Sequence, residues 1–68
     1  MIYVFLADGF EETEAICPLD ILRRAGLEVY TVSVSGRKSV LSSRKIPVEA
    51  DLLLEELTEK TPEGVVLP

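Results

Sequence analysis

The sequence contains no histidine, no tryptophan and a single cysteine, Cys17. One cysteine cannot form a disulfide bond within the chain, and without histidine the usual cluster of zinc ligands cannot be assembled. We therefore expect no metal site and no cofactor. An unpaired thiol is also typical of a reducing compartment, so the expected location is the cytoplasm.

Positive charge is scarce as well. The chain has 7 lysines and arginines against 12 aspartates and glutamates, which gives a formal net charge of −5. This balance argues against binding to nucleic acid, which requires a basic face. No segment approaches the ~18 apolar residues of a membrane span, and the first residues lack the basic stretch of a signal peptide. We expect a protein that binds neither nucleic acid nor membrane.

The chain is short and has a high content of hydrophobic residues. With 68 residues it is long enough for one small domain, and a chain of that size buries only roughly 60% of its unfolded surface. Hydrophobic residues nevertheless make up 47% of the sequence. Such a composition suits a parallel sheet, whose strands are covered on both faces and are almost continuously apolar.

Five segments have the composition of strands. The first, residues 2–7, is an unbroken run of apolar residues that favour strands, which indicates a central strand. The others are residues 27–34, two short strands or a ribbon at 39–43 and 46–49, and a buried strand at 65–67. Pro47 limits the second of the two short strands, 46–49, to an edge, because proline has no N–H to donate.

The segment between the first two strands is predicted to be a helix. Its opening turns carry three acidic residues, which interact well with the positive end of the helix dipole: Glu11, Glu12 and Glu14. Its last turn carries two basic residues, Arg23 and Arg24, and Gly26 is placed to end it. Pro18 interrupts the hydrogen-bond ladder. The apolar stripe continues beyond that proline, so we expect one bent helix with Ala15, Leu19, Leu22 and Ala25 facing the sheet.

The order of these elements predicts an α/β fold. Strand, helix, strand, ribbon, helix and strand in succession imply a right-handed β-α-β crossover and a parallel sheet. The second helix is expected over residues 52–57, capped by Asp51, with a loop at 61–64. Because ligands of such sheets bind beyond the carboxyl ends of the strands, the loop Asp8–Phe10 is the place to look for chemistry.

That loop does not have the composition of a phosphate-binding loop. Gly9 is its only glycine, no Lys-Ser/Thr pair follows, and the acidic residues after it would repel phosphate. Nucleotide binding is therefore disfavoured.

Residues 6–26, LADGFEETEAICPLDILRRAG, resemble the first β-α unit of the ThiJ/PfpI superfamily. The features shared are the small loop, the Glu-Glu-x-Glu helix start, the proline region and the Arg-Arg-Ala-Gly ending. The likeness continues through Ser42-Ser43-Arg44 to the closing VVLP. It implies a flavodoxin-like, doubly wound parallel sheet in a three-layer sandwich. Residues 1–68 would then be the N-terminal portion of a single domain, about the first third if such a domain has ~180–200 residues.

The family's activity depends on a cysteine at a tight strand-to-helix turn, which is helped by a glutamate of the first helix. Glu14 matches that glutamate. A protonated carboxyl group near a thiol donates a hydrogen bond to the thiolate and lowers the pKa of the thiol. Without the resemblance, the same residue is a solvated carboxylate on a helix face. The family's cysteine and histidine would lie beyond Pro68.

The resemblance also assigns an anion-binding pocket, formed partly across a dimer contact. Its matching residues are Arg24 and Arg44, with Ser42 and Ser43 beside Arg44 as weaker candidates. Gly9 and Asp8 line the adjoining loop by topology alone. Arginine suits such a pocket because its planar fork binds carboxylate or phosphate. The alternatives are that Arg24 only complements the helix dipole and that Arg44 is a solvated charge on the ribbon.

Cys17 is not expected to be the nucleophile. It lies inside the predicted helix, away from any strand-to-helix elbow. We expect it to be a small buried apolar side chain.

Three functions follow from these expectations. The first is a cysteine-dependent enzyme that acts on small reactive aldehydes or glycated substrates, of glyoxalase or protein-deglycase type; older family names refer to thiazole monophosphate biosynthesis and intracellular proteolysis. The second is a redox-sensing or chaperone-like stress-response protein with the same cysteine. The third is a structural fragment only, because these residues alone lack the nucleophile. The resemblance further implies a homodimer through the first helix and contact with the remainder of the domain.

Overall fold

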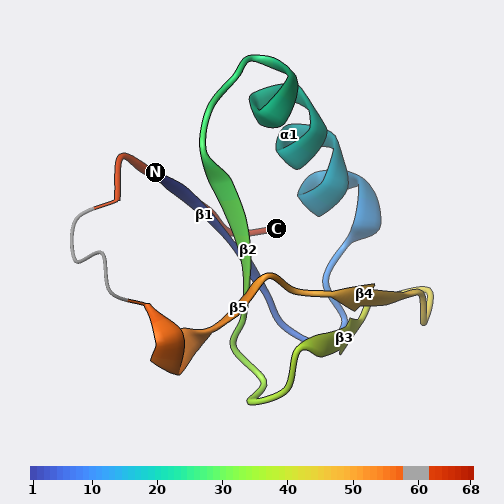
Figure 1. The fold of residues 1–68 in the computed structure, drawn as a ribbon. Coiled ribbons are helices and arrows are strands. Elements are labelled where there is room, and N and C mark those ends of the chain that lie inside the picture. Colours follow the sequence, from blue (N-terminus) through green and yellow to red (C-terminus); the bar gives the residue numbers. More distant parts are fainter. Residues whose placement is uncertain (58–61) are drawn as a thin grey trace.

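The fold is built on a four-stranded parallel sheet (Figure 1). It was obtained as a computed structural model that describes residues 1–57 and 62–68. The strands are β1 (Ile2–Leu6), β2 (Val29–Ser33), β5 (Leu52–Leu53) and β6 (Gly64–Val66), in the order β5-β2-β1-β6. Ile2 lies opposite Val29 on one side and Gly64 on the other. The parallel sheet and the central position of the first strand are confirmed.

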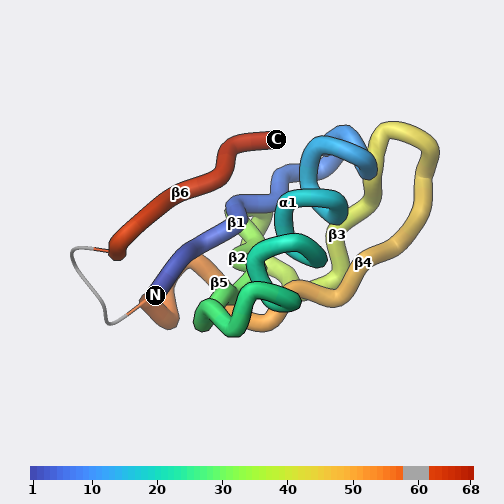
Figure 2. The backbone as a smooth tube through the Cα atoms, turned by 90° about the horizontal axis from the view of Figure 1, so that it is seen from above, coloured from blue at the N-terminus to red at the C-terminus, as the bar shows by residue number. Residues whose placement is uncertain are grey.

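One helix, α1 (Glu12–Arg24), covers one face of this sheet. Figure 2 shows it on one side of the strands, with β6 next to β1 and away from the helix. The helix is continuous through Pro18, as expected. Because proline has no N–H, the carbonyl of Glu14, four residues earlier, has no partner in the helical ladder.

The core lies between α1 and the sheet. Its buried members come from strand, loop, helix and ribbon: Val4, Leu6, Phe10, Ala15, Val29, Val40 and Ala50. Leu19 and Leu22 pack against this cluster, so three of the four predicted stripe residues face the sheet. Ala25 is exposed at the end of the helix. The opposite face of the sheet also holds buried residues, among them Tyr3 and Val32.

An antiparallel ribbon adjoins the core. It consists of β3 (Ser39–Leu41) and β4 (Pro47–Glu49), with Val40 opposite Val48. Both strands are shorter than the predicted 39–43 and 46–49, because the chain turns around Lys45, whose φ is 65°. An isolated β-bridge between Phe10 and Ser42 helps to attach the ribbon to the loop that follows β1.

The prediction of a helix over residues 52–57 is wrong. Leu52 and Leu53 form β5, which pairs with β2, and only one 3-10 turn, η1 (Leu54–Glu56), follows. Asp51 does not cap a helix; its Oδ2 accepts hydrogen bonds from the N–H of Thr31 at 2.9 Å and from Arg23 at 2.9 Å. Six residues form few intrahelical bonds, whereas pairing with the free edge of β2 satisfies the same backbone groups.

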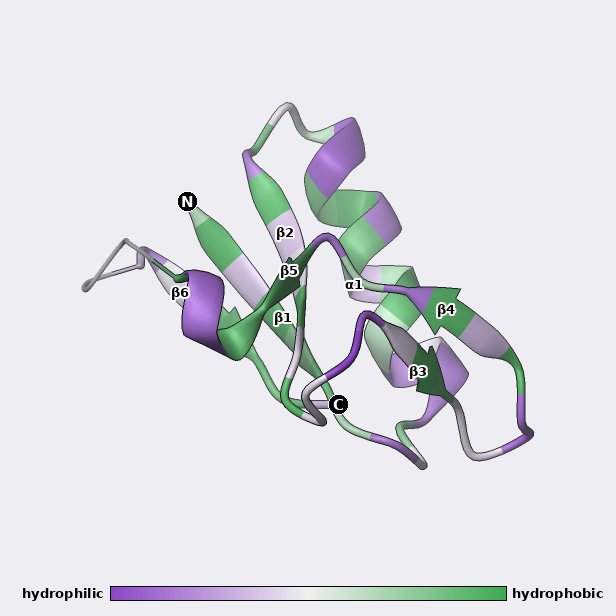
Figure 3. Cartoon of the chain, turned by 60° about the horizontal axis from the view of Figure 1, so that its bottom comes forward, coloured by the Kyte–Doolittle hydropathy of each residue, from purple (hydrophilic) through white to green (hydrophobic). Residues whose placement is uncertain are grey.

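The last strand is present but less buried than expected. β6 begins at Gly64, one residue before the prediction, and Val65 and Leu67 are 49% and 78% exposed. Figure 3 shows green, apolar colour on the strands as well as on α1. Of the loop predicted at 61–64, residue 61 lies outside the described residues, residues 62–63 are not in a strand, and residue 64 belongs to β6.

Candidate functional site

The loop after β1 is attached to the ribbon by its backbone and by one carboxylate. Gly9 donates from its N–H to the carbonyl of Leu41 at 2.7 Å, and it does so with a φ of +92°. That backbone region is open to glycine but strained for other residues. Asp8 accepts hydrogen bonds from the N–H of Leu41 at 3.0 Å and from Arg37 at 2.8 Å. The loop at the carboxyl end of β1 therefore has a fixed shape.

The three glutamates at the start of α1 have three different environments. Glu11 is the N-cap residue, and its carboxylate accepts a hydrogen bond from the N–H of Glu14 at 2.8 Å. It thereby satisfies one of the N–H groups that the first helical turn leaves without a partner.

Glu12 binds the turn of the ribbon. Its carboxylate accepts hydrogen bonds from the hydroxyl of Ser42, from the hydroxyl of Ser43 at 3.3 Å and from the N–H of Arg44 at 2.9 Å. The Ser42 hydrogen bond, followed by those of the Glu12 and Arg44 N–H groups, lowers the pKa of Glu12 from 4.5 to about 2, because hydrogen bonds to a carboxylate favour its charged form. The contact therefore stabilises the fold fully above pH 4.5 and is lost only as the pH falls towards 2.

The sequence did not reveal this role of Glu12. It was expected to complement the helix dipole, and it does lie in the first turn. Its contacts, however, are with residues 30 to 32 positions later in the chain. The one signal in the sequence is the pair of serines beside Arg44, which are polar groups of the same loop.

Glu14, the expected catalytic glutamate, is exposed on the first turns of α1. Its carboxylate makes no hydrogen bond or ion pair with residues 1–57 or 62–68. Of Glu11, Glu12 and Glu14, it is thus the one whose carboxylate has no partner among the described residues. Its catalytic role stays a prediction.

Gly9 and Arg44 lie at the same end of α1 as Glu14, whereas Arg24 does not. The backbone of Arg44 is held by Glu12, and its guanidinium has no partner among the described residues. Arg24 follows Glu14 by ten residues, about 15 Å along the helix axis. It forms an i,i+4 ion pair of 3.0 Å with Asp20, next to the negative pole of the helix. The anion-binding pocket and the dimer contact that the resemblance assigns to both arginines stay predictions.

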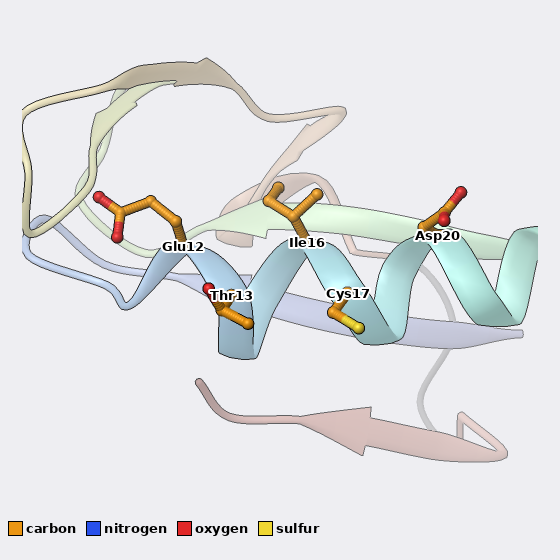
Figure 4. A pocket seen from close by; sticks show the side chains of 5 residues that line it. All are labelled: Glu12, Thr13, Ile16, Cys17 and Asp20. Carbon is orange, nitrogen blue, oxygen red and sulfur yellow. The ribbon is translucent and has the colours of Figure 1, made fainter.

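Cys17 is exposed, so the expectation that it is buried is wrong. It lies on the side of α1 turned away from the sheet, in an open depression lined by Glu12, Thr13, Ile16, Cys17 and Asp20 (Figure 4). The prediction was wrong because the apolar stripe that meets the sheet passes through Ala15, Leu19 and Leu22, and position 17 is not on that stripe.

No group of three or more histidine, cysteine, aspartate or glutamate side chains in residues 1–57 and 62–68 is arranged to hold a metal ion. Within the same ranges, no helix combines the length and the hydrophobicity needed to cross a membrane.

The comparisons with known proteins agree on one family. The model of the DJ-1/PfpI family matches residues 1–68. The Parkinson disease protein 7 homolog of Danio rerio is 39% identical over 64 residues, which are 94% of this chain and 34% of that protein. A Thermococcus kodakarensis protein named as a deglycase is 33% identical over 67 residues, 98% of this chain and 40% of that protein.

The fold is matched equally well by solved structures. The oxidized DJ-1 of Toxoplasma gondii superposes with a TM-score of 0.93 at 37% sequence identity, covering 98% of this chain and 36% of that one. The expected flavodoxin-like α/β architecture is thereby confirmed for the part that is present. The chain spans 34% to 40% of the length of these three proteins.

Proposed function

Since the chain belongs to the DJ-1/PfpI family, we propose that it forms the first third of a single domain that acts on small reactive aldehydes or glycated groups. The reacting thiolate comes from a cysteine in a later segment of that domain. The deglycase name of the Thermococcus kodakarensis relative supports this class of substrate. Glyoxalase and protein-deglycase reactions share one first step, the attack of a thiolate on a carbonyl carbon.

In this mechanism Glu14 has two successive tasks. Its protonated carboxyl group first donates a hydrogen bond to the thiolate, which stabilises the charged sulfur. When the sulfur bonds to the carbonyl carbon, the carbonyl oxygen becomes negative and accepts the proton from Glu14. The glutamate is left as a carboxylate, which then acts as the base for the second half of the reaction.

The observation that carries the proposal is the uncommitted carboxylate of Glu14. Glu11 caps the helix and Glu12 holds the ribbon, so neither is free to meet a sulfur. Glu14 has no partner in residues 1–57 or 62–68. It follows the loop at the carboxyl end of β1, where ligands of parallel sheets bind.

The remaining site residues fit the same reaction. Arg44 and the loop at Gly9 border the start of α1, and the Arg44 guanidinium is available for an anionic group of the substrate. Arg24 joins them from a second subunit if the domain pairs along α1. The proposed setting is the cytoplasm, because an unpaired thiol persists in a reducing compartment.

A second function rests on the same cysteine. A thiolate of low pKa is also the form that peroxide oxidises, so the domain would then serve as a redox sensor or a chaperone-like stress-response protein. The favouring observation is that the matched DJ-1 of Toxoplasma gondii is in an oxidized form. A histidine downstream of the cysteine would favour turnover, and its absence would favour sensing.

The first prediction concerns Glu14→Gln in the complete domain. Consumption of glyoxal should fall about 100-fold or more, the lower range for loss of a general acid–base group. Glutamine keeps the size of the side chain but has no acidic proton to transfer. Glu49→Gln is the matched control, because Glu49 is an exposed glutamate on β4. An unchanged rate in Glu14→Gln would remove Glu14 from the mechanism.

A further inference from the structure

One carboxylate holds the turn between β3 and β4 against the start of α1. Glu12 Oε2 accepts hydrogen bonds from the hydroxyl of Ser42 and from the N–H of Arg44, the latter at 2.9 Å. The hydroxyl of Ser43 donates to the other oxygen at 3.3 Å. The backbone at Arg44 is therefore fixed by a residue 32 positions earlier in the chain.

Ser42 passes this restraint on to the rest of the turn. Its side chain is buried, with 3% exposed, and its hydroxyl oxygen accepts a hydrogen bond from the N–H of Ile46 at 2.9 Å. Its carbonyl accepts from the N–H of Lys45 at 2.9 Å, where φ is positive. A hydroxyl has one proton to donate, and in Ser42 that proton goes to Glu12.

Glu12 holds the backbone of Arg44 and not its side chain. The guanidinium of Arg44 has no hydrogen bond or ion pair with the described residues. An arginine side chain has large rotamer freedom, so the region that its guanidinium reaches depends on where its backbone is anchored. A binding group is effective only if its supporting contacts keep that region small.

We infer that Glu12 is a positioning residue, which places the Arg44 guanidinium at the anion-binding site beside Glu14. This inference rests on the proposed role of Arg44 in binding an anionic group. It assigns Glu12 a task different from that of Glu14: Glu12 does not touch the substrate and acts only through the backbone of Arg44.

Two substitutions in the complete domain separate the effect of the length of the Glu12 side chain from the effect of its charge. Glu12→Asp keeps the charge but shortens the side chain by one methylene, so its carboxylate falls short of the turn. Glu12→Gln loses the charge but keeps the reach, because its Oε1 takes the place of the oxygen that accepts from Ser42 and Arg44. The probe is inorganic phosphate, and its dissociation constant is measured by calorimetry or by NMR titration.

The dissociation constant for phosphate should rise about tenfold in Glu12→Asp, the size of effect that the loss of one charge-assisted hydrogen bond produces. In Glu12→Gln it should stay within about threefold of the wild-type value. Arg44→Ala should weaken phosphate binding at least as much as Glu12→Asp. The double variant should lose no more than Arg44→Ala alone, because both changes act on one group. The exchange rate of the Arg44 amide hydrogen should rise in Glu12→Asp only.

The controls distinguish the two proposals. If Arg44→Ala weakens phosphate binding and Glu12→Asp does not, the inference is overturned and the role of Arg44 stands. If Arg44→Ala binds phosphate as the wild type does, the proposed anion site fails and the inference fails with it. Aspartate remains favourable in a first helical turn, so Glu12→Asp should fold. Failure to fold would mean that the main role of Glu12 is to stabilise the fold, and would also overturn the inference.

Discussion

At the scale of single residues, carboxylates such as Glu12 and Asp51 organise contacts between distant segments. Glu12 joins α1 to the ribbon, and Asp51 joins the end of the ribbon to β2 and α1. Asp51 and Thr31 exchange hydrogen bonds in both directions, because the N–H of Asp51 also donates to the Thr31 hydroxyl at 2.9 Å. Each of these carboxylates contributes at a junction where no regular ladder supplies partners.

Asp51→Ala is expected to destabilise the complete domain by about 1–3 kcal/mol, because it leaves the partly buried N–H of Thr31 without its acceptor. Asp51→Asn should cost less, since its one carbonyl oxygen can still accept from that N–H. The free energies are measured by urea unfolding, with Glu55→Ala as the control at an exposed glutamate of η1. Equal stability of Asp51→Ala and the control would show that the junction contributes nothing.

These residue contacts could not be predicted from the sequence. Glu12 and Ser42 are 30 positions apart, and Thr31 and Asp51 are 20 apart. Their meeting depends on the path of the chain, whereas a capping residue is recognised from its neighbours. For that reason the sequence predicts Asp51 as a helix cap, the local use of an aspartate, although its partners lie on β2 and α1.

At the scale of elements, local signals were sufficient. The acidic first turn, the basic last turn and Gly26 predicted α1, and the helix ends where they indicated. The N–H of Gly26 donates to the carbonyl of Arg23 at 3.0 Å, and that of Leu27 to the carbonyl of Leu22 at 3.2 Å. These two bonds form a Schellman motif, which requires the left-handed backbone that Gly26 has, with φ at +84°.

Gly26→Ala should therefore destabilise the complete domain by about 1–2 kcal/mol through backbone strain alone. An added Cβ would meet no atom within 4 Å, so crowding makes no contribution. The matched control is Gly64→Ala: its φ is not positive, and its Cβ would lie 3.7 Å from Ile2, an ordinary contact. Thermal unfolding measures both variants, and a loss as large at position 64 would contradict the conformational explanation.

The elements after the ribbon were predicted less well, for a physical reason. The run from residue 52 to residue 57 is apolar and acidic, and it suits a helix by composition. The start of this segment forms a strand because the edge of β2 is free, and Val32 pairs there with Leu52. Sheet edges are created by the tertiary fold, so a local pattern contains no information about them.

At the scale of the whole molecule, the order of elements along the chain predicted the parallel sheet. The sheet is present, with its strands in the order β5-β2-β1-β6. In the described residues one α-helix covers one face. Large apolar side chains remain exposed, among them Ile21 at 59% and Leu67 at 78%. These side chains lie on α1 and after β6, and their exposure fits the proposal that the chain is part of a larger domain.

Expressed alone, residues 1–68 should fold poorly. A chain of this length buries only roughly 60% of its surface even in a complete fold, and here much apolar surface stays in contact with water. The expected result is a broad thermal transition with weak near-ultraviolet circular dichroism and poorly dispersed amide resonances. A sharp, cooperative melt of the isolated chain would contradict the view that it depends on the rest of a domain.

The central claim is that Glu14 stabilises the thiolate of a cysteine supplied by another segment. The most direct test is the thiol pKa, measured from the pH dependence of alkylation by iodoacetamide in the complete domain. In Glu14→Gln the thiol pKa should rise by about one unit or more, because the amide N–H of glutamine is a weaker donor to the thiolate than the O–H of a protonated carboxyl group and stabilises its charged form less. An unchanged thiol pKa, with the same alkylation profile as the Glu49→Gln control, would contradict the account.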